Sequence, residues 1–327
     1  MLSLTTTRLR DFATGMDTRI PGWDLYAVQT TAGRIGGDSR DLQLDGIQVL
    51  HEAFRNVSTN QFGRAPDDAY VLGVPRVMHQ PGRFNGREWC SGITAWDGRR
   101  AFDSIVPPME LFSLSVERRL LAEQMRITEQ VDLEHWLAKG CVVVNDAALG
   151  QRLSQQIATL FDSCFTADDP PLSPRRQQLV RDTLLEVLAP VVAERLGAQA
   201  APLYDVSHLH VVRRAREVAL DRIGEPLQVR DLCAATGACR RSLQNSFQAV
   251  LGTTPLQYLR ALRLDGARRT LLAGTPGLTV TQVAEQWGFW HLSRFGQDYR
   301  RTFGELPSET LRRCGVAANE PDERLAA

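Results

Sequence analysis

Two similar units about 50 residues apart constrain the last third of the 327-residue chain more than any other feature of its sequence. The first unit reads LQVRDLCAATGACRRSLQNSFQAVLGTTPLQYL and the second reads LTVTQVAEQWGFWHLSRFGQDYRRTFGELPSET. When Gly237 is aligned with Gly288, each unit has apolar residues before the glycine and an apolar pair after it, and each ends in Gly-x-x-Pro. This pattern predicts helix, tight turn, helix in each unit, which is the helix-turn-helix arrangement.

The apolar spacing places the first helices at about residues 228–235 and 279–286. Each glycine then follows a helix end, where the left-handed conformation costs little only for glycine. The second helix is expected to bury Leu243 with Phe247 in one unit, and Phe295 with Tyr299 in the other. The opposite faces of these second helices are therefore expected to meet solvent or a partner.

Those opposite faces carry side chains that suit the major groove of DNA, where Arg pairs with guanine and Gln or Asn with adenine. The candidates for reading base edges are Arg241, Gln244, Asn245, Ser293, Arg294 and Gln297. The candidates for contacting phosphates, which position a protein without reading sequence, are Arg240, His291, Arg300 and Arg301. For each of them the alternative is a solvated helix residue. Trp287 is interpreted as core, and for Trp290 packing is preferred to a phosphate contact.

The charge is distributed unevenly along a chain whose net charge is zero. Residues 1–205 hold 21 basic and 26 acidic residues, whereas residues 206–327 hold 17 basic and 12 acidic ones. An acidic half followed by a basic half favours a polyanionic partner such as nucleic acid for the second half. Solvated helix faces are the alternative interpretation of this asymmetry.

Residues of about 212–313 resemble the DNA-binding domain of the AraC/XylS family of bacterial transcription regulators. The motifs that carry the resemblance are Val283-Ala284, Gly288-Phe289, Ser293, Phe295, Tyr299-Arg300, Phe303-Gly304, Pro307 and the linker-like segment 255–272. The resemblance implies seven helices, two recognition helices joined by a rigid helix, insertion into successive major grooves of double-stranded DNA, and RNA polymerase as a further partner. Cys239 stands where this family usually has a capping serine, which puts a polar cap of the first recognition helix in doubt.

The first 200 residues show two other patterns. Short apolar runs broken by Gly, Pro, Asn and Asp over residues 20–115 predict a β-rich sandwich or barrel. Helical periodicity follows, with two predicted amphipathic helices whose apolar positions are Leu149, Leu153, Ile157 and Leu160, then Leu179, Leu184, Val187, Leu188 and Val191. The predicted fold is α+β and multidomain: a β-rich sensing domain (1–145), a helical dimerisation or linker region (146–205), an all-α DNA-binding domain (206–315) and a tail (316–327).

No cofactor or metal is predicted. The six cysteines form no C-x-x-C pair or Cys/His cluster, and His51-Glu52 with His79 is too sparse for a cupin metal site. Nucleophile-elbow and P-loop motifs are absent from the sequence, so the chain is not expected to be an enzyme. A ligand pocket would be mostly apolar; its aromatic candidates are Trp23, Tyr26, Phe54, Tyr70, Trp89 and Trp96.

These patterns predict a cytoplasmic, sequence-specific DNA-binding regulator, most simply an activator, whose N-terminal domain forms a homodimer, senses a small-molecule effector, or does both. The N-terminal half is weakly similar to regulators of the ethanolamine-utilisation type, a similarity that transfers no ligand. Two alternatives stay open. One is a cupin-like enzyme barrel fused to a DNA-binding module, and the other is a dimeric regulator that needs no ligand. A signal peptide and a membrane span are not expected from the apolar pattern.

Overall fold

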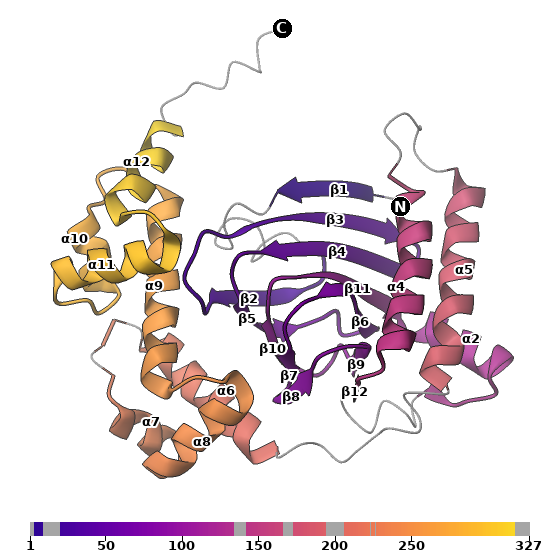
Figure 1. Cartoon of the computed structure of the whole chain (residues 1–327), viewed down its shortest axis with the longest axis horizontal. Coiled ribbons are helices and arrows are strands. Elements are labelled where there is room, and N and C mark those ends of the chain that lie inside the picture. Colours follow the sequence, from indigo (N-terminus) through magenta and orange to yellow (C-terminus); the bar gives the residue numbers. More distant parts are fainter. Residues whose placement is uncertain are drawn as a thin grey trace, which may run out of the picture.

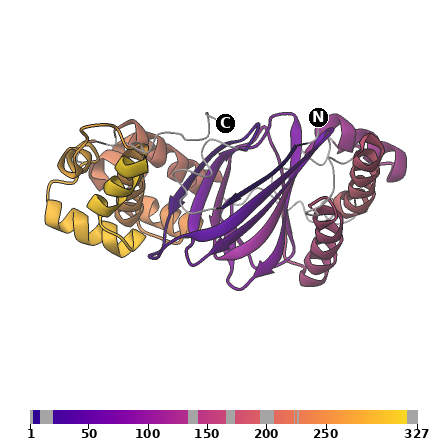
Figure 2. The ribbon, with the colours of Figure 1, turned by 90° about the horizontal axis from the view of Figure 1, so that it is seen from above.

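The structure is a computed structural model that describes residues 3–8, 20–133, 142–165, 173–193, 206–222, 224–225 and 227–317. Figures 1 and 2 show four layers side by side: a helical layer, two β-sheets, and a second helical layer that holds the C-terminal half. The predicted domain boundary near residue 205 and the predicted tail at 316–327 lie mostly outside the described residues. Among the residues described, no helix combines the length and apolar character needed to cross a bilayer.

The first sheet has seven antiparallel strands. In spatial order they are β1 (Ser3–Arg8), β3 (Gly36–Leu44), β4 (Ile47–Arg55), β11 (Met109–Glu117), β6 (Ala69–Met78), β9 (Ile93–Asp97) and β12 (Val142–Val144). Residues 47–54 of β4 are buried on both faces, because one face meets helices and the other meets the second sheet.

The second sheet has five antiparallel strands and packs face to face against the first. In spatial order they are β2 (Asp24–Gln29), β5 (Thr59–Arg64), β10 (Phe102–Val106), β7 (Gly82–Phe84) and β8 (Arg87–Trp89). The core between the sheets includes Leu25, Phe84, Trp96, Phe102 and Leu111. The predicted β-rich sandwich is confirmed.

Three helices cover the outer face of the seven-stranded sheet: α2 (Arg118–Thr128), α4 (Ala147–Asp162) and α5 (Pro174–Val191). Alternate residues of β11, Phe112 and Leu114 among them, point to these helices, as the two-residue period of a strand requires. The apolar face predicted for α4 is buried at Leu149, Leu153 and Ile157, while Leu160 is only partly buried against the same core.

The apolar face predicted for α5 needs one correction. Leu184 and Leu188 are buried as expected, but Leu179 is 66% exposed. Val180 fills the core position instead, because it lies four residues before Leu184 and so on the same side of the helix.

The C-terminal half contains seven described helices, as the family resemblance implies: α6 (Val206–Asp221), α7 (Val229–Thr236), α8 (Arg240–Leu251), α9 (Pro255–Ala273), α10 (Val280–Gln286), α11 (Leu292–Phe303) and α12 (Pro307–Ala317). The two first helices predicted from the apolar spacing are α7 and α10, each beginning one residue later than expected. The α+β fold class, with a β-rich first part and an all-α last part, is confirmed.

The five-stranded sheet joins the two halves of the molecule. Its outer face contributes Val28, with Tyr26, Phe62 and Ile105 partly buried around it, to a core shared with α6 to α9. A buried polar network lies beside this core, in which the Arg216 guanidinium of α6 is 2.7 Å from the Asp103 carboxylate of β10. The sandwich and the helical half therefore meet through a packed interface that contains charge.

That network has two further members. Arg216 Nε donates to the Tyr258 hydroxyl at 2.7 Å, and this hydroxyl donates to Asn60 Oδ1 at 2.9 Å. Asn60 in turn donates to Asp103 at 2.8 Å. The guanidinium also stacks 3.7 Å over the ring of Phe62. Every polar member is buried, and the charge of Arg216 is paired with a carboxylate of the other half.

Candidate nucleic-acid interface

In the first helix-turn-helix unit, each helix is capped by residues next to it in the sequence. Gln228 caps α7 together with Asp231, whose carboxylate accepts from the Gln228 N–H at 2.7 Å. Gly237 ends α7 at φ +68°, the left-handed conformation expected there. Cys239 then begins α8, because its Sγ accepts from the backbone N–H of Ser242 at 3.5 Å.

The cap of α8 resolves the doubt that Cys239 raised, since its thiol takes the place of a serine hydroxyl. The hydrogen bond with the Ser242 hydroxyl, 3.2 Å away, also lowers the pKa of the Cys239 thiol. Sulfur is a weak acceptor, so this cap is weaker than an oxygen cap would be.

Helix α8 has two distinct faces. Leu243 and Phe247 are buried in the core, as predicted. The candidate DNA-contacting residues of this unit are all exposed: Arg240, Arg241, Gln244 and Asn245. They occupy the first half of the helix, the part that approaches base edges in helix-turn-helix proteins.

The second unit also has two helices with one buried and one exposed face, but its turn differs from that of the first unit. Thr279 caps α10, Trp287 ends it, and Gly288 follows at φ +72°. On α11 the predicted anchors Phe295 and Tyr299 are buried. The candidate DNA-contacting residues of this unit are all exposed: His291, Ser293, Arg294, Gln297, Arg300 and Arg301.

The two tryptophans beside this turn behave differently. Trp287 packs with the core of α9 to α12, as predicted, and its indole N–H donates to Thr270 at 2.9 Å. Gly266 leaves room for that ring, since a Cβ at this position would collide with it. Trp290 is 66% exposed, so the preference for packing was wrong. It and Leu292, which is 45% exposed, extend the exposed face of the turn and α11.

Helix α9 belongs to both units and fixes their relation. Leu259 and Leu262 pack in the core of the first unit, whereas Leu264, Ala267 and Leu271 pack in the core of the second. Figure 1 shows α8 near one end of α9 and α11 near the other. Helices α8 and α11 are thus both held by α9.

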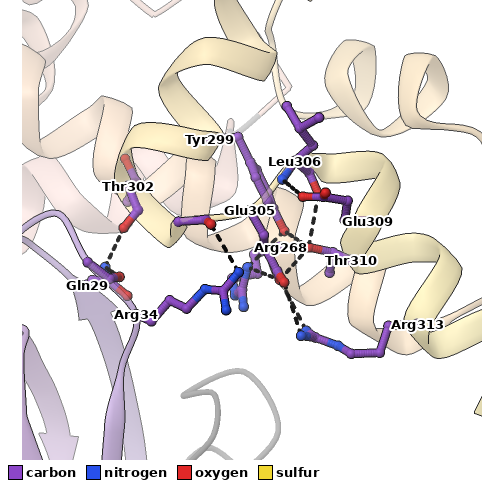
Figure 3. A network of polar contacts seen from close by, with 12 residues as sticks. Gln29, Arg34, Arg268, Tyr299, Thr302, Glu305, Leu306, Glu309, Thr310 and Arg313 are labelled. Carbon is purple, nitrogen blue, oxygen red and sulfur yellow. Dashed lines mark hydrogen bonds and ion pairs between the residues drawn. The ribbon is translucent and has the colours of Figure 1, made fainter.

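A network of buried ion pairs and hydrogen bonds connects the second unit to α9 (Figure 3). Arg268 of α9 pairs with Glu305 at 3.0 Å, and Glu305 accepts from Thr310 at 2.7 Å. The Tyr299 hydroxyl donates to Thr310 at 2.9 Å. Although burial opposes it, the Thr310 hydrogen bond and the charges of Arg268 and Arg313 hold the pKa of Glu305 below its usual value. The network therefore ties the orientation of α11 to α9 and α12.

The basic surface of the second unit includes Arg260 of α9. Arg260 pairs with Asp298 of α11, which also accepts from Arg301 at 3.3 Å. Burial lowers the pKa of Arg260, and the nearby charges of Arg294 and Arg301 lower it further. Three arginines are thus close together where α9 and α11 meet, and an anion placed among them would relieve their mutual repulsion.

Side chains of the sandwich donate hydrogen bonds to the C-terminal ends of α8 and α11. Gln29 donates to the Thr302 carbonyl at 2.7 Å and Arg34 donates to the Gly304 carbonyl at 3.2 Å, both at the end of α11 (Figure 3). Arg83 donates to the Ala249 carbonyl near the end of α8 at 2.6 Å. The sequence pattern did not identify these contacts. They leave the first halves of α8 and α11 uncovered, so DNA-contacting candidates stay exposed while the halves are docked.

This arrangement can offer polar and cationic side chains to DNA. In the part of the chain that the structure describes, no three His, Cys, Asp or Glu side chains lie close enough to hold a metal ion. The described cysteines are free thiols, and two of them, Cys90 and Cys239, are exposed.

Comparison with known proteins agrees with this geometry. A helix-turn-helix domain model matches residues 232–313. A probable thc operon regulatory protein of Rhodococcus erythropolis is 30% identical over 208 residues, which are 63% of this chain and 62% of that protein. A XylDLEGF operon transcriptional activator of Pseudomonas putida is 31% identical over 135 residues, which are 41% of this chain and 81% of that protein. The chain thus spans about six tenths of the length of the Rhodococcus relative.

A solved structure is also similar to the helical half. A probable AraC family transcriptional regulator from Rhodopseudomonas palustris CGA009 is 36% identical, with a TM-score of 0.30 over 32% of this chain and 96% of that one. The relatives named here are transcription regulators, not enzymes. On the match to the Pseudomonas activator and the two helix-turn-helix units, the chain belongs to the AraC/XylS family of DNA-binding transcription regulators.

Proposed function

We propose that this chain is a sequence-specific transcription activator that inserts α8 and α11 into successive major grooves on one face of DNA. The observation that carries the proposal is the pair of exposed polar faces on two helices held by α9. Successive major grooves of one DNA face are ~34 Å apart, a spacing that one rigid connecting helix can match.

Within this proposal the exposed residues divide by role. Arg241, Gln244, Asn245, Ser293, Arg294 and Gln297 read base edges. Arg240, His291, Arg300 and Arg301 contact phosphates. Arg260 adds to the phosphate-binding surface, since it lies beside Arg294 and Arg301.

The rest of the chain has regulatory roles in the proposal. The sandwich, with residues 1–145, senses a small molecule, and the region 146–205 contributes helices to a homodimer, while residues 206–315 bind DNA and meet RNA polymerase. The contacts of the sandwich with Ala249, Thr302 and Gly304 support a sensing role, because they link it to both recognition helices. Sedimentation equilibrium tests the dimer, which a monomer at all concentrations would contradict.

The test of DNA reading is selection of bound duplexes from a random pool by the wild type and by Arg241→Ala/Arg294→Ala. The wild type is expected to enrich a bipartite motif with halves about one helical turn apart. Each substitution should cost ~1–3 kcal/mol and relax specificity in one half.

Arg214→Ala/Arg312→Ala is the matched control, because it removes two exposed arginines of the same domain outside the recognition helices. This control should keep the motif. A wild type that enriches no motif, with binding that merely fades as salt rises, would contradict sequence-specific reading. An unchanged motif in Arg241→Ala/Arg294→Ala would contradict these two residue assignments.

A further inference from the structure

A small cavity lies inside the β-sandwich, between the two sheets. Its volume is about 30 Å³, and its walls are aromatic and aliphatic apart from a few polar side chains: Glu52, Gln61, Thr94, Ser104 and Ser113. Sixteen residues line it, and Glu52 is the one charged group among the described ones. The cavity is therefore an apolar space that contains a carboxyl group without a countercharge.

Glu52 has no partner for one of its oxygens. The side chain belongs to β4, is 4% exposed, and its Oε1 accepts no hydrogen bond from any described residue. Burial, and to a smaller extent the charge of Asp41 on β3, raise the pKa of Glu52 to about 8. Among the described lining residues of β5, β9, β10 and β11, none is charged. A buried carboxylate is costly unless a cation pairs with it, and the protein supplies none here.

Aromatic rings surround the same space. The ring centroids of Phe84, Phe102 and Trp23 lie 4.7, 5.4 and 6.3 Å from that of Trp96, and Trp89 also lines the cavity. The faces of such rings attract ammonium groups, most strongly where water is excluded. Carboxyl group and rings thus favour the same kind of ligand, an organic cation.

Other unpartnered polar atoms lie in these walls. Gln61 Nε2, Trp89 Nε1 and Trp96 Nε1 are buried, and none has a hydrogen-bond partner among the described residues. These three groups are N–H donors, so they pair with an acceptor, such as a water molecule that enters with the ligand, and not with an ammonium group; the charge that the cavity favours is set by Glu52. A cavity of this size holds about two water molecules, so a ligand that leaves the walls in place has only a few heavy atoms.

We propose that this cavity binds a small primary ammonium compound, whose charged group pairs with Glu52 inside the ring of aromatic side chains. The proposal rests on the sensing role proposed above for the sandwich and names the chemical class of its effector. An organic anion is disfavoured at the same place, because the carboxyl group would face it and no described cation would balance it.

The strands that bound the cavity also hold the DNA-binding half. On β5, Gln61 faces the cavity, while its neighbour Asn60 bonds to Tyr258 of α9. On β10, Ser104 faces the cavity, while its neighbour Asp103 pairs with Arg216 of α6. A single layer of strands therefore separates the proposed ligand from the helical half, and a shift on one face moves residues on the other.

The test measures binding of ethylammonium, ethanol and acetate to the full chain at neutral pH, without DNA, by calorimetry and by the shift in Tm. Ethylammonium is expected to bind and to raise Tm, whereas its neutral and anionic counterparts do not. Glu52→Gln should weaken ethylammonium binding about ten-fold or more, the loss of one charged hydrogen-bonded pair. Glu110→Gln is the matched control, since Glu110 lies opposite Ala53 and so projects from the other face of the same sheet.

A second readout separates this role from a structural one. Because the Glu52 carboxyl is neutral in the empty cavity, binding of an ammonium should release up to one proton, measurable by calorimetry in buffers of different ionisation enthalpy. No binding of ethylammonium, equal binding by Glu52→Gln, or an equal response to ethanol or acetate would overturn the proposal. DNA reading is measured separately by duplex selection, so a negative result here leaves that proposal untouched.

Discussion

Replacing Arg216 with alanine is expected to loosen the contact between the sandwich and the DNA-binding half. The Arg216 side chain is 5% exposed and the Asp103 side chain 1% exposed, and they face each other across the interface. The substitution removes the cation and leaves Asp103 as a buried charge, with Tyr258 and Asn60 losing a donor. The lost free energy destabilises the docked arrangement relative to the separated halves, because Arg216 and Asp103 belong to different halves.

The size of the effect follows from the burial of the pair. Removing one partner of a buried ion pair costs ~3–5 kcal/mol. At about 1.4 kcal/mol per ten-fold change, this loss shifts the equilibrium between docked and separated halves by about a hundred-fold to several thousand-fold. A surface ion pair such as Arg214–Glu217 would by contrast contribute ~1 kcal/mol or less.

Two measurements check this prediction. Small-angle X-ray scattering should give a larger radius of gyration for Arg216→Ala than for the wild type, and urea unfolding should show the lost stability. The double variant Arg216→Met/Asp103→Leu, which replaces both charges with apolar groups, should regain most of the loss. An Arg216→Ala variant that scatters like the wild type and loses less than ~1 kcal/mol would refute the reasoning, since that is the scale of an ordinary hydrogen bond.

Two further substitutions have calculable consequences. Glu52 holds a proton in the folded chain up to a pH of about 8, whereas the unfolded chain releases it near the usual value of 4.5, so stability falls as pH rises between these values. From pH 6 to 9 this loss amounts to roughly 3 kcal/mol, and urea titrations of Glu52→Gln should lack it; an identical pH profile in the variant would contradict the assignment. Gly266→Ala should cost ~1–3 kcal/mol, because its Cβ collides with the Trp287 ring, and in duplex selection it should blur the half-site read by α11; an unchanged Tm would show that the ring can move aside.

Much of the sandwich is predictable because its strands have strong local patterns. The apolar runs in β2, β4, β6, β9 and β11 all mark strands. The strands β3 and β5 (GGDSRDLQL and TNQFGR) lack such runs. In β5 the polar residues Asn60 and Gln61 are buried, because one bonds to the helical half and the other faces the cavity. Neither the bond to the helical half nor the cavity can be inferred from the sequence around β5.

The exposed polar faces of α8 and α11 are predictable for a related reason. In a helix that buries Leu243 with Phe247, the next two positions after Leu243 turn away from the core, so local periodicity assigns Gln244 and Asn245 to solvent. The contacts that position these helices come from distant residues instead. From the sequence alone Arg216 would be taken for an exposed arginine of α6. Its partner Asp103 lies more than a hundred residues earlier in the chain. The local sequence pattern therefore predicts which faces of these helices are exposed, but not the long-range contacts that orient the helices.

The shared use of α9 limits how such regulators can be recombined. Leu262 and Leu264 are two residues apart, yet they pack in the cores of different helix-turn-helix units. A crossover elsewhere within Pro255–Ala273 would therefore divide one core between two parent proteins, whereas a crossover at residue 263 leaves both cores whole. A chimaera of two such regulators is therefore expected to fold best when its junction lies at residue 263, within α9 and not in the loops that flank this helix.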